Sequence, residues 1–221
     1  MCGRFTLNSN LDALQLRFGF EARDLDYRPR YNIAPTQPVL AVVNDGGRRA
    51  EFMRWGLIPF WAKDASIGSR MINARAETVA QKPAFRNSLR QRRCLILADG
   101  YYEWRKEEKG KTPMYIAAKT NEPFAMAGLF DTWKSPEGEL IRSCAIITTS
   151  PNSLMEPIHN RMPVILSKDA ETIWLDPAIE NTGDLLPLLT PCPADGFQAH
   201  AVSTLVNSAK NDFPECIMAA G

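Results

Sequence analysis

The chain consists mainly of short apolar runs separated by Gly, Pro, Asn or charged residues, a pattern typical of short strands joined by turns. Sixteen prolines spread through the sequence add to the number of expected turns. The apolar runs predict strands over residues 39–43, 51–55, 94–98, 101–105, 114–118, 124–129, 144–149 and 164–166.

Helices are expected between these strands, over residues 11–18, 83–91, 168–175 and 184–189. Pro83 suits the first turn of the second helix, and Ser167 is a good N-cap for the third. Strands joined by mixed turns and occasional helices predict an α+β fold. Because 221 residues with 45% hydrophobic content contain no repeat, low-complexity tract or long linker, we expect one domain over residues 1–221.

The charge of the chain excludes only one class of partner. Lysine and arginine total 26 and aspartate and glutamate total 25, which gives a formal net charge of +1. This balance excludes a strongly basic nucleic-acid coat protein. A local basic groove remains compatible with overall neutrality, so the total charge says nothing further about partners.

Five cysteines are scattered through the chain without a C-x-x-C pair, and their odd number does not fit a disulfide framework. Their spacing does not fit a zinc site either, so we expect no metal or other cofactor. The start of the chain lacks a signal-peptide pattern, and no run of about 18 apolar residues occurs. We therefore expect a cytoplasmic protein that is neither exported nor membrane-bound.

Cys2 would become the amino terminus if Met1 were removed. An amino-terminal cysteine carries an α-amine of pKa roughly 7.7 to 8 and a thiol of pKa near 8.5 on adjacent carbons. The amine can form a Schiff base with an aldehyde, and the thiol can then close a five-membered thiazolidine intramolecularly. Cys2 therefore indicates aldehyde capture. An incidental cysteine is the alternative, and retention of Met1 would block the chemistry.

The chain has only two histidines. His159 lies in the proline-bounded segment 157–163 directly before an apolar run, and a rigid loop of this kind can aim an imidazole at a substrate. A surface or structural imidazole is the alternative for His159. His200, flanked by alanines in a strand-like segment, is predicted to be structural.

Glu103 follows an Asp-Gly turn signal at residues 99–100, and strand alternation places it on the same face as Tyr101. Aromatic neighbours would partly desolvate the carboxylate, and desolvation raises a glutamate pKa toward the range useful for general acid or base catalysis. Sugar ring opening and imine formation both require such proton transfers. The alternative is an exposed glutamate on an edge strand.

Asn73 and Arg75 are two residues apart, so their side chains share one face if the segment is extended. Asparagine offers a donor and an acceptor, and arginine matches phosphate oxygens bidentately, which makes this face a candidate phosphate-binding surface. A salt bridge between Arg75 and Glu77, or another acid, explains the same residues equally well.

Basic residues recur at spacings of four, four and three after this segment, at Lys82, Arg86, Arg90 and Arg93. On the predicted helix they form a basic stripe, with Phe85 and Leu89 available to face inward. A solvated helix face is the ordinary explanation, and contact with a nucleic-acid backbone is the alternative.

Three aromatic residues, Trp55, Phe60 and Trp61, occur within a Gly/Pro-containing loop. Aromatic side chains in loops can stack on unpaired bases, at about 1–3 kcal/mol for each base, which suits single strands better than duplexes. Trp55 and Phe60 are explained equally well as core residues. Trp61, next to Lys63, is the better candidate for stacking.

Together these motifs resemble the SOS-response-associated peptidase domain family, also called the abasic-site processing or embryonic-stem-cell 5-hydroxymethylcytosine-binding protein family. The resemblance runs almost from end to end. It rests on Cys-Gly-Arg-Phe at 2–5, Arg-Tyr-Asn-Ile-Ala-Pro at 30–35, Trp-Gly-Leu-Ile-Pro at 55–59, Ile-Asn-Ala-Arg-Ala-Glu-Thr at 72–78, Ala-Asp-Gly-Tyr-Tyr-Glu-Trp at 98–104 and His-Asn-Arg-Met-Pro at 159–163.

The resemblance implies a single domain with a mainly antiparallel, barrel-like β core flanked by short helices. It implies a covalent sensor of abasic sites in single-stranded DNA, in which an exposed Cys2 amine attacks the ring-opened deoxyribose aldehyde and the thiol closes a thiazolidine. The crosslink would protect the lesion from cleavage during the DNA damage response. Asn73 would orient the Cys2 terminus, Glu103 would assist proton transfers, and His159 would act as acid or base on the sugar.

The resemblance also implies DNA contacts by Arg4, Pro35, Trp61, Arg75, Thr148 and Arg161. Pro35 and Trp61 would lie near displaced bases, and Thr148 near the backbone. No individual contact is carried over to the basic stripe, because family members vary there. They also differ at Phe60, where an adjacent tryptophan can stand, so the strength of stacking stays open. We expect a monomer that associates with the nucleoid on damage.

Two other functions fit some of the same residues. A cysteine peptidase would use Cys2 as nucleophile, His159 as base and Asn73 as orienting amide, and could remove Met1 autocatalytically. A non-catalytic single-strand DNA-binding module would bind intact and abasic strands equally, with a steep salt dependence. Acetylation of the Cys2 amine distinguishes aldehyde capture from peptidase activity, because it abolishes the capture and leaves a thiolate-based protease active.

Overall fold

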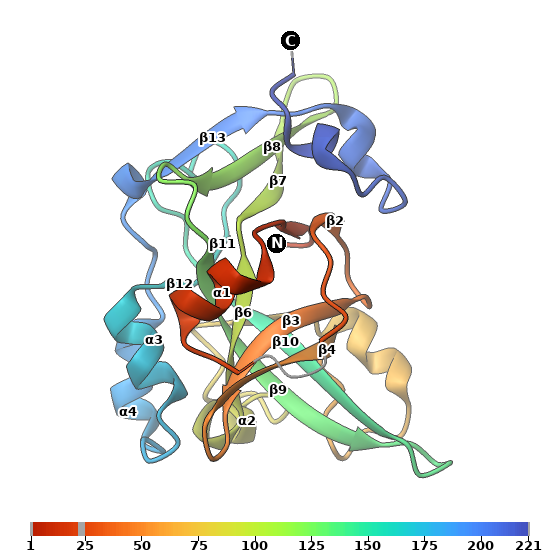
Figure 1. Cartoon of the computed structure of the whole chain (residues 1–221), viewed down its shortest axis with the longest axis vertical. Coiled ribbons are helices and arrows are strands. Elements are labelled where there is room, and N and C mark those ends of the chain that lie inside the picture. Colours follow the sequence, from red (N-terminus) through yellow and green to blue (C-terminus); the bar gives the residue numbers. More distant parts are fainter. Residues whose placement is uncertain (1, 22–24, 221) are drawn as a thin grey trace.

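A computed structural model describes residues 2–21 and 25–220, and the described strands form two sheets (Figure 1). The larger, eight-stranded sheet contains a closed barrel, because its strand order β10–β4–β3–β6–β9 is completed by pairing of β9 with β10. The barrel strands are β3 (Pro38–Asn44), β4 (Arg48–Trp55), β6 (Arg93–Ala98), β9 (Phe124–Lys134) and β10 (Leu140–Thr149). The barrel-like core expected from the resemblance is therefore confirmed.

Most neighbouring barrel strands are antiparallel, and β4 with β10 is a parallel pair. Strand β6 is buried along its whole length because it contacts β1, α2 and α3 in addition to its barrel neighbours. Gly128 on β9 leaves room for β6, since a Cβ there would lie 2.7 Å from Cys94 Sγ. These features explain why the barrel strands contain continuous apolar runs.

Three short strands extend the barrel sheet and bring distant segments to β10 and β9. Strand β5 (Asn73–Arg75) pairs in parallel with β10, and β11 (Met162–Pro163) pairs antiparallel with the end of β10. Strand β12 (Ile165–Leu166) pairs with β9. The segments 72–78 and 159–163 therefore both pair with β10, and they meet at Thr148.

The second sheet lies above the barrel in Figure 1 and has the order β13–β8–β7–β1–β2. All its neighbouring strands are antiparallel. Its strands are β1 (Phe5–Leu7), β2 (Arg30–Ile33), β7 (Gly100–Lys106), β8 (Lys111–Ala118) and β13 (Phe197–Ala201). Because β1 pairs with β2 on one side and β7 on the other, the start of the chain is held between these two strands.

The helices are short and lie outside the sheets, as expected (Figure 1). The helices α1 (Leu11–Phe18) and α3 (Lys168–Leu175) have the predicted bounds, and Ser167 caps α3 by accepting from Ala170 N–H. The remaining helical segments are α2 (Arg86–Gln91), α4 (Thr182–Leu185), η1 (Ala65–Arg70), η2 (Leu186–Leu188), η3 (Ala194–Gly196), η4 (Thr204–Asn207) and η5 (Pro214–Ile217).

Two predicted helices differ from the structure at their ends. The helix expected over 83–91 begins only at Arg86, and Pro83 lies in the preceding turn. The helix expected over 184–189 is split into α4 and the 3₁₀-helix η2, which contains Pro187. Asn181 caps α4 by accepting from Gly183 N–H, and Pro187 lacks the N–H that an α-helix interior requires.

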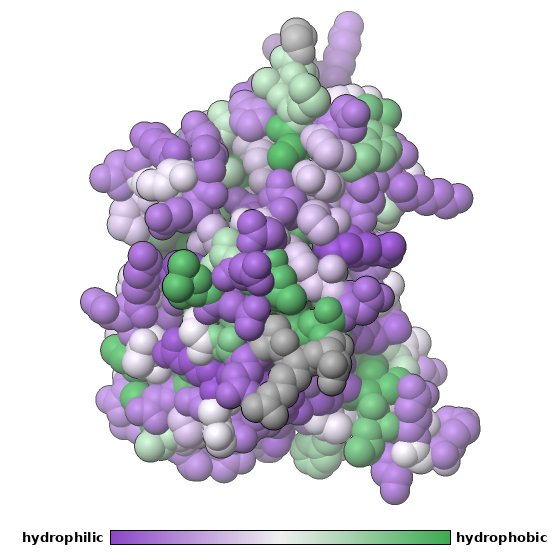
Figure 2. All heavy atoms as spheres, in the orientation of Figure 1, coloured by the Kyte–Doolittle hydropathy of each residue, from purple (hydrophilic) through white to green (hydrophobic). Residues whose placement is uncertain are grey.

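The surface in the view of Figure 2 is mainly hydrophilic, and hydrophobic residues are visible there in small separate groups. Within residues 2–21 and 25–220, no helix is both long and apolar enough to cross a membrane. All five cysteines are free and buried. The described residues contain no cluster of three or more His, Cys, Asp or Glu side chains suited to hold a metal ion.

Candidate active site

Cys2 lies where the start of the chain runs beside β7. Tyr102 N–H on β7 donates to Arg4 O at 2.9 Å, so the residues before Arg4 run past Glu103. The Cys2 residue is 0% exposed. In this sequence, which includes Met1, the α-amine of Cys2 is part of a peptide bond, so the exposed terminus implied by the resemblance requires removal of Met1 and stays a prediction.

Asn73 holds the backbone of Cys2. Its position is fixed by β10, because β5 pairs in parallel with that strand and places Asn73 opposite Ile146. The Asn73 Nδ2 group donates to Cys2 O at 2.8 Å. Among the described residues, no donor bonds to the buried Oδ1 of Asn73. The side chain thus orients Cys2 and keeps one unused acceptor.

Glu103 and His159 form an acid–base pair whose pKa values shift in opposite directions. Glu103 is 3% exposed, and burial raises the pKa of its carboxyl to about 7. Burial lowers the pKa of His159, which favours its neutral imidazole. The His159 Nδ1 atom lies 4.0 Å from Glu103 Oε1. A carboxylic acid and a neutral imidazole can therefore coexist here near neutral pH.

The loop between β10 and β11 aims His159. Its backbone N–H donates to Met155 O at 2.8 Å, and Arg161 N–H donates to His159 Nδ1 at 3.0 Å. The Nδ1 atom also lies 3.2 Å from Arg161 O, so a proton on Nδ1 has an acceptor and leaves Nε2 free to accept. This loop therefore fixes the position of the ring.

The Cys2 thiol is held in its protonated form. Burial raises its pKa, and the negative charge of Glu103 raises it further. Because thiolate is the reactive form of cysteine, this environment disfavours direct attack by sulfur at neutral pH. The site is better suited to a thiol that reacts second, after another group has activated the substrate.

Arg161 lies beside this cluster and is bound on two sides. Its guanidinium donates to Glu77 Oε1 at 2.6 Å and to Glu77 Oε2 at 3.0 Å. The Nη2 atom also donates to Thr148 O at 2.6 Å. The Thr148 side chain is 0% exposed, so the DNA contact implied for it has no accessible surface in this structure. Thr148 contacts Arg161 instead.

Arg75 is the exposed arginine at the end of β5. The alternative salt bridge between Arg75 and Glu77 is not formed, because Glu77 pairs with Arg161. Within the described part of the chain, Arg75 makes no ion pair within 4.0 Å. Its guanidinium is therefore accessible to an anionic ligand.

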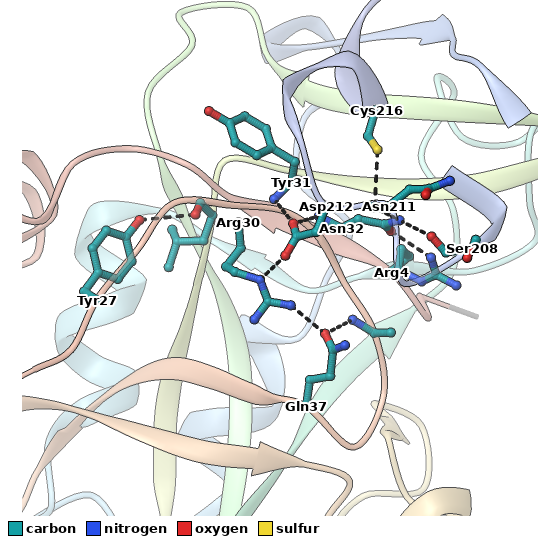
Figure 3. A network of polar contacts seen from close by, with 12 residues as sticks. Arg4, Tyr27, Arg30, Tyr31, Asn32, Gln37, Ser208, Asn211, Asp212 and Cys216 are labelled. Atoms are coloured by element: carbon teal, nitrogen blue, oxygen red, sulfur yellow. Dashed lines mark hydrogen bonds and ion pairs between the residues drawn. The ribbon is translucent and has the colours of Figure 1, made fainter. Parts of the chain in front are cut away.

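Arg4 is fixed by a network of hydrogen bonds that links the C-terminal segment, residues 206–212, to β2 (Figure 3). Arg4 Nη1 donates to Asn32 Oδ1 and to Val206 O, both at 2.7 Å. Asn32 Nδ2 donates to the carbonyls of the same C-terminal segment, at Val206, Ser208 and Asn211. Asp212 accepts from Asn32 N–H at 2.9 Å and pairs with Arg30. Arg4 is therefore a positioned, half-buried cation.

The aromatic loop divides between core and surface. Trp55 is 0% exposed and packs edge-on against Phe5 at a centroid distance of 5.1 Å, as a core residue does. Phe60 and Trp61 are 56% and 50% exposed, so the core explanation for Phe60 is wrong. Gly56 starts the turn with φ 125°, where a Cβ would lie 2.5 Å from Gly68 O.

Part of the predicted basic stripe is structural. Arg93 is 6% exposed, begins β6, and donates to four carbonyl oxygens, at Leu89, Arg90, Trp174 and Asp176. Lys82, Arg86 and Arg90 remain on the surface, and Arg90 lies 3.7 Å from Glu180. Phe85 and Leu89 face inward as predicted.

Comparison with known proteins identifies the family. The family model "SOS response associated peptidase (SRAP)" matches residues 1–209. The chain belongs to the SOS response associated peptidase family. A curated relative, "Abasic site processing protein YoqW" of Bacillus subtilis, is 50% identical over 98% of this chain and 99% of its own length. "Abasic site processing protein HMCES" of Xenopus tropicalis is 36% identical over 87% of this chain and 67% of its own length.

A solved structure has the same fold as this family member. A protein from Bacteroides thetaiotaomicron superposes with a TM-score of 0.91 at 29% identity and covers 99% of this chain and 100% of its own. The match extends over both sheets, since nearly the whole chain is aligned. The predicted α+β fold class is thereby confirmed.

The sequence of this SOS response associated peptidase family member did not reveal which residues support the site. Pro35 is partly exposed in the turn after β2, and Thr36 beside it adopts φ 73°, a conformation rare for a β-branched residue. The support of Arg4 by Asn32 and Asp212 depends on contacts between distant segments.

His200, predicted to be structural, has its Nε2 2.9 Å from Ile217 O.

Proposed function

We propose that this chain, once Met1 is removed, captures abasic sites in single-stranded DNA by forming a thiazolidine at Cys2. The observation that carries the proposal is the placement of Cys2 against Asn73, beside Glu103 and His159 with their opposite pKa shifts. The names of the relatives, which are abasic site processing proteins, support the same lesion as target.

The reaction begins with the sugar. An abasic deoxyribose is mostly a cyclic hemiacetal, so its ring must open before an aldehyde is available. Neutral His159 accepts the proton of the C1′ hydroxyl, and protonated Glu103 donates a proton to the ring oxygen that leaves C1′. The assignment follows from the environments, since Glu103 has a raised pKa and His159 a lowered one.

The covalent step joins Cys2 to the aldehyde carbon. The α-amine attacks that carbon, and the Glu103 carboxylate transfers a proton from the amine to the new oxygen to give a carbinolamine. Its hydroxyl group leaves as water after protonation by His159, which carries the proton taken from C1′. The thiol then adds to the resulting iminium carbon, and its proton returns to Glu103. The sum is aldehyde plus amino-terminal cysteine giving thiazolidine plus water. Asn73 keeps both nucleophiles in place by holding Cys2 O, and its free Oδ1 can accept from the amine.

The exposed residues around the centre support single-stranded DNA as the partner. Phe60 and Trp61 are half exposed in a loop, where they can stack on unpaired bases. Arg75 offers an unpaired guanidinium for a phosphate, and Arg4 is positioned by the network of Figure 3. Pro35 lies in a partly exposed turn beside the strained Thr36.

A cysteine peptidase is the weaker alternative for this site. Such an enzyme needs a thiolate, whereas burial and the charge of Glu103 raise the pKa of the Cys2 thiol. A plain single-strand binding module does not require the buried acid–base pair of Glu103 and His159. Both alternatives remain as outcomes of the experiment.

The test is intact mass spectrometry of Met1-free protein after incubation with a single-stranded oligonucleotide that carries one abasic site. The expected product has the mass of protein plus oligonucleotide minus one water, and it is absent for an intact oligonucleotide and for Cys2→Ala. Cys2→Ser retains the amine, so it should give an adduct only after borohydride reduction. No adduct from Met1-free wild type would refute the proposal, and cleavage of peptide substrates would then favour the peptidase.

A further inference from the structure

Glu77 and Arg161 form an ion pair at the edge of the site, and the two partners differ in exposure. The carboxylate of Glu77 is 52% exposed, whereas the Arg161 side chain is 15% exposed. The pair is bidentate, at 2.6 and 3.0 Å. The more accessible partner is thus the carboxylate, which covers the guanidinium that the family resemblance assigns to DNA.

The donors of Arg161 leave little capacity for a further ligand. Nη1 and Nη2 both donate to Glu77, and Nη2 also donates to Thr148 O. The Nε atom is buried and bonds to no acceptor among the described residues. A phosphate diester presents two oxygens to a guanidinium in the same fork geometry as a carboxylate. A phosphate and the Glu77 carboxylate therefore require the same edge of Arg161.

The two partners also differ in how firmly they are held. Arg161 is anchored by Thr148 O on buried strand β10, so its guanidinium keeps its place when Glu77 leaves. The Glu77 backbone follows Ala76, whose N–H is bonded to Thr148 O at 2.9 Å, so only the side chain needs to move. Release of an exposed carboxylate into water costs little.

We propose that Glu77 is an internal competitor for a DNA backbone phosphate, held on Arg161 in the free protein and displaced when a strand binds. The proposal depends on the DNA-binding function proposed above. Its consequence is weaker binding to intact strands, so that lasting retention depends on the covalent bond at a lesion. Exposed Arg75, two residues before Glu77, remains available to the incoming strand throughout.

The first test compares the affinity of three proteins for an intact single-stranded oligonucleotide by fluorescence anisotropy at fixed salt. Glu77→Gln is expected to bind about three- to fivefold more tightly than wild type, the upper part of the range for an exposed ion pair. Asp45→Asn is the matched control, because Asp45 in the turn between β3 and β4 is 48% exposed and pairs with Arg49 on β4. It carries the same charge change and should stay within about twofold of wild type.

A double-variant cycle separates competition at Arg161 from a general charge effect. In an Arg161→Gln background, Glu77→Gln should no longer tighten binding, because the contested guanidinium is gone. Equal tightening in both backgrounds, or tightening by Asp45→Asn to the same degree, would overturn the proposal. Unchanged or weaker binding by Glu77→Gln would overturn it as well, and would assign Glu77 to the positioning of Arg161. Circular dichroism melts confirm that the variants are folded.

These outcomes are distinct from failure of the proposed function. A wild type that binds strands but forms no adduct with an abasic oligonucleotide would refute covalent capture and leave the anisotropy result valid. A wild type that binds no single-stranded DNA would overturn both proposals. If both proposals hold, Glu77→Gln should also form an adduct with an abasic oligonucleotide, because Glu77 lies outside the group of Cys2, Asn73, Glu103 and His159.

Discussion

Cys2 and Glu103 are 0% and 3% exposed, whereas Phe60 and Trp61 of the aromatic loop are 56% and 50% exposed. The resemblance led us to expect both regions to act on the same DNA strand. The reaction centre is built from both sheets, through β1 and β7 of the second sheet and β5 of the barrel sheet. The aromatic loop instead follows β4 and is held against β9, where Phe60 N–H donates to Asp131 Oδ2 and Trp133 Nε1 donates to Ala62 O.

The difference follows from what each region must do. Burial shifts the pKa of Glu103 upward and that of His159 downward, and such shifts are unattainable for side chains surrounded by water. Stacking on bases and pairing with phosphates require the opposite, because the ligand must reach the side chain. We therefore expect substitutions in the buried centre to change rate and stability, and substitutions at the exposed rim to change affinity.

Glu103→Gln should produce the largest effect. An amide is isosteric with the acid but donates no proton, so the rate of adduct formation should fall by about 10²- to 10⁴-fold. Affinity for an intact strand should stay within about twofold of wild type. Quenched-flow gels with an abasic oligonucleotide measure the rate, and anisotropy measures the affinity. Equal loss in both measurements would remove the distinction between the two regions.

The same variant should gain stability at alkaline pH. The folded-state pKa of Glu103 is raised from its ordinary value of 4.5 to about 7, so the folded protein binds more protons than the unfolded chain between these values. Wild-type stability should therefore fall as pH rises through this window. Glu103→Gln removes this loss and should be more stable at pH 8 by about 1–3 kcal/mol. Urea denaturation at pH 5 and pH 8 measures both proteins, and a gain of the same size at pH 5 would contradict the assignment.

Trp61→Ala should weaken binding to intact single strands by about 1–3 kcal/mol, because one stacking surface is lost. At saturating DNA, the rate of adduct formation should be unchanged. Phe52→Ala is the control, since Phe52 is also an exposed aromatic, at 39%, but lies on β4 outside the loop. Equal losses from both substitutions would show that the loop has no special role.

Arg75→Gln should have the smallest effect, visible in the salt dependence. Loss of one phosphate contact should reduce the slope of log affinity against log salt by about 0.7 for a single strand. Arg49→Gln is the control, because the Arg49 side chain is 41% exposed and already pairs with Asp45. Anisotropy titrations at several salt concentrations give the slope, and an unchanged slope for Arg75→Gln would exclude the phosphate contact.

The predicted elements were most accurate where the local sequence carried its own boundary signals. Helices α1 and α3 have the predicted bounds because Asn10 and Ser167 cap them. The strands β1, β2, β5 and β11 were not predicted, because segments of two to four residues are too short to show an alternation of apolar and polar residues. They exist because other strands offer them an edge to pair with: β1 pairs with β7, β2 pairs with β1, and β5 and β11 pair with β10.

Sequence by itself determined the chemical types at the site, because the nucleophiles of Cys2, the carboxyl of Glu103 and the imidazole of His159 are properties of single residues. It also determined the apolar runs that form the barrel. Only the tertiary structure decided which groups meet and how they are solvated: it buried Cys2 and Thr148, directed Glu77 to Arg161, and left Phe60 exposed. The reason is that pKa values and ion pairs depend on neighbours that lie far apart in the chain and are brought together by the pairing of strands.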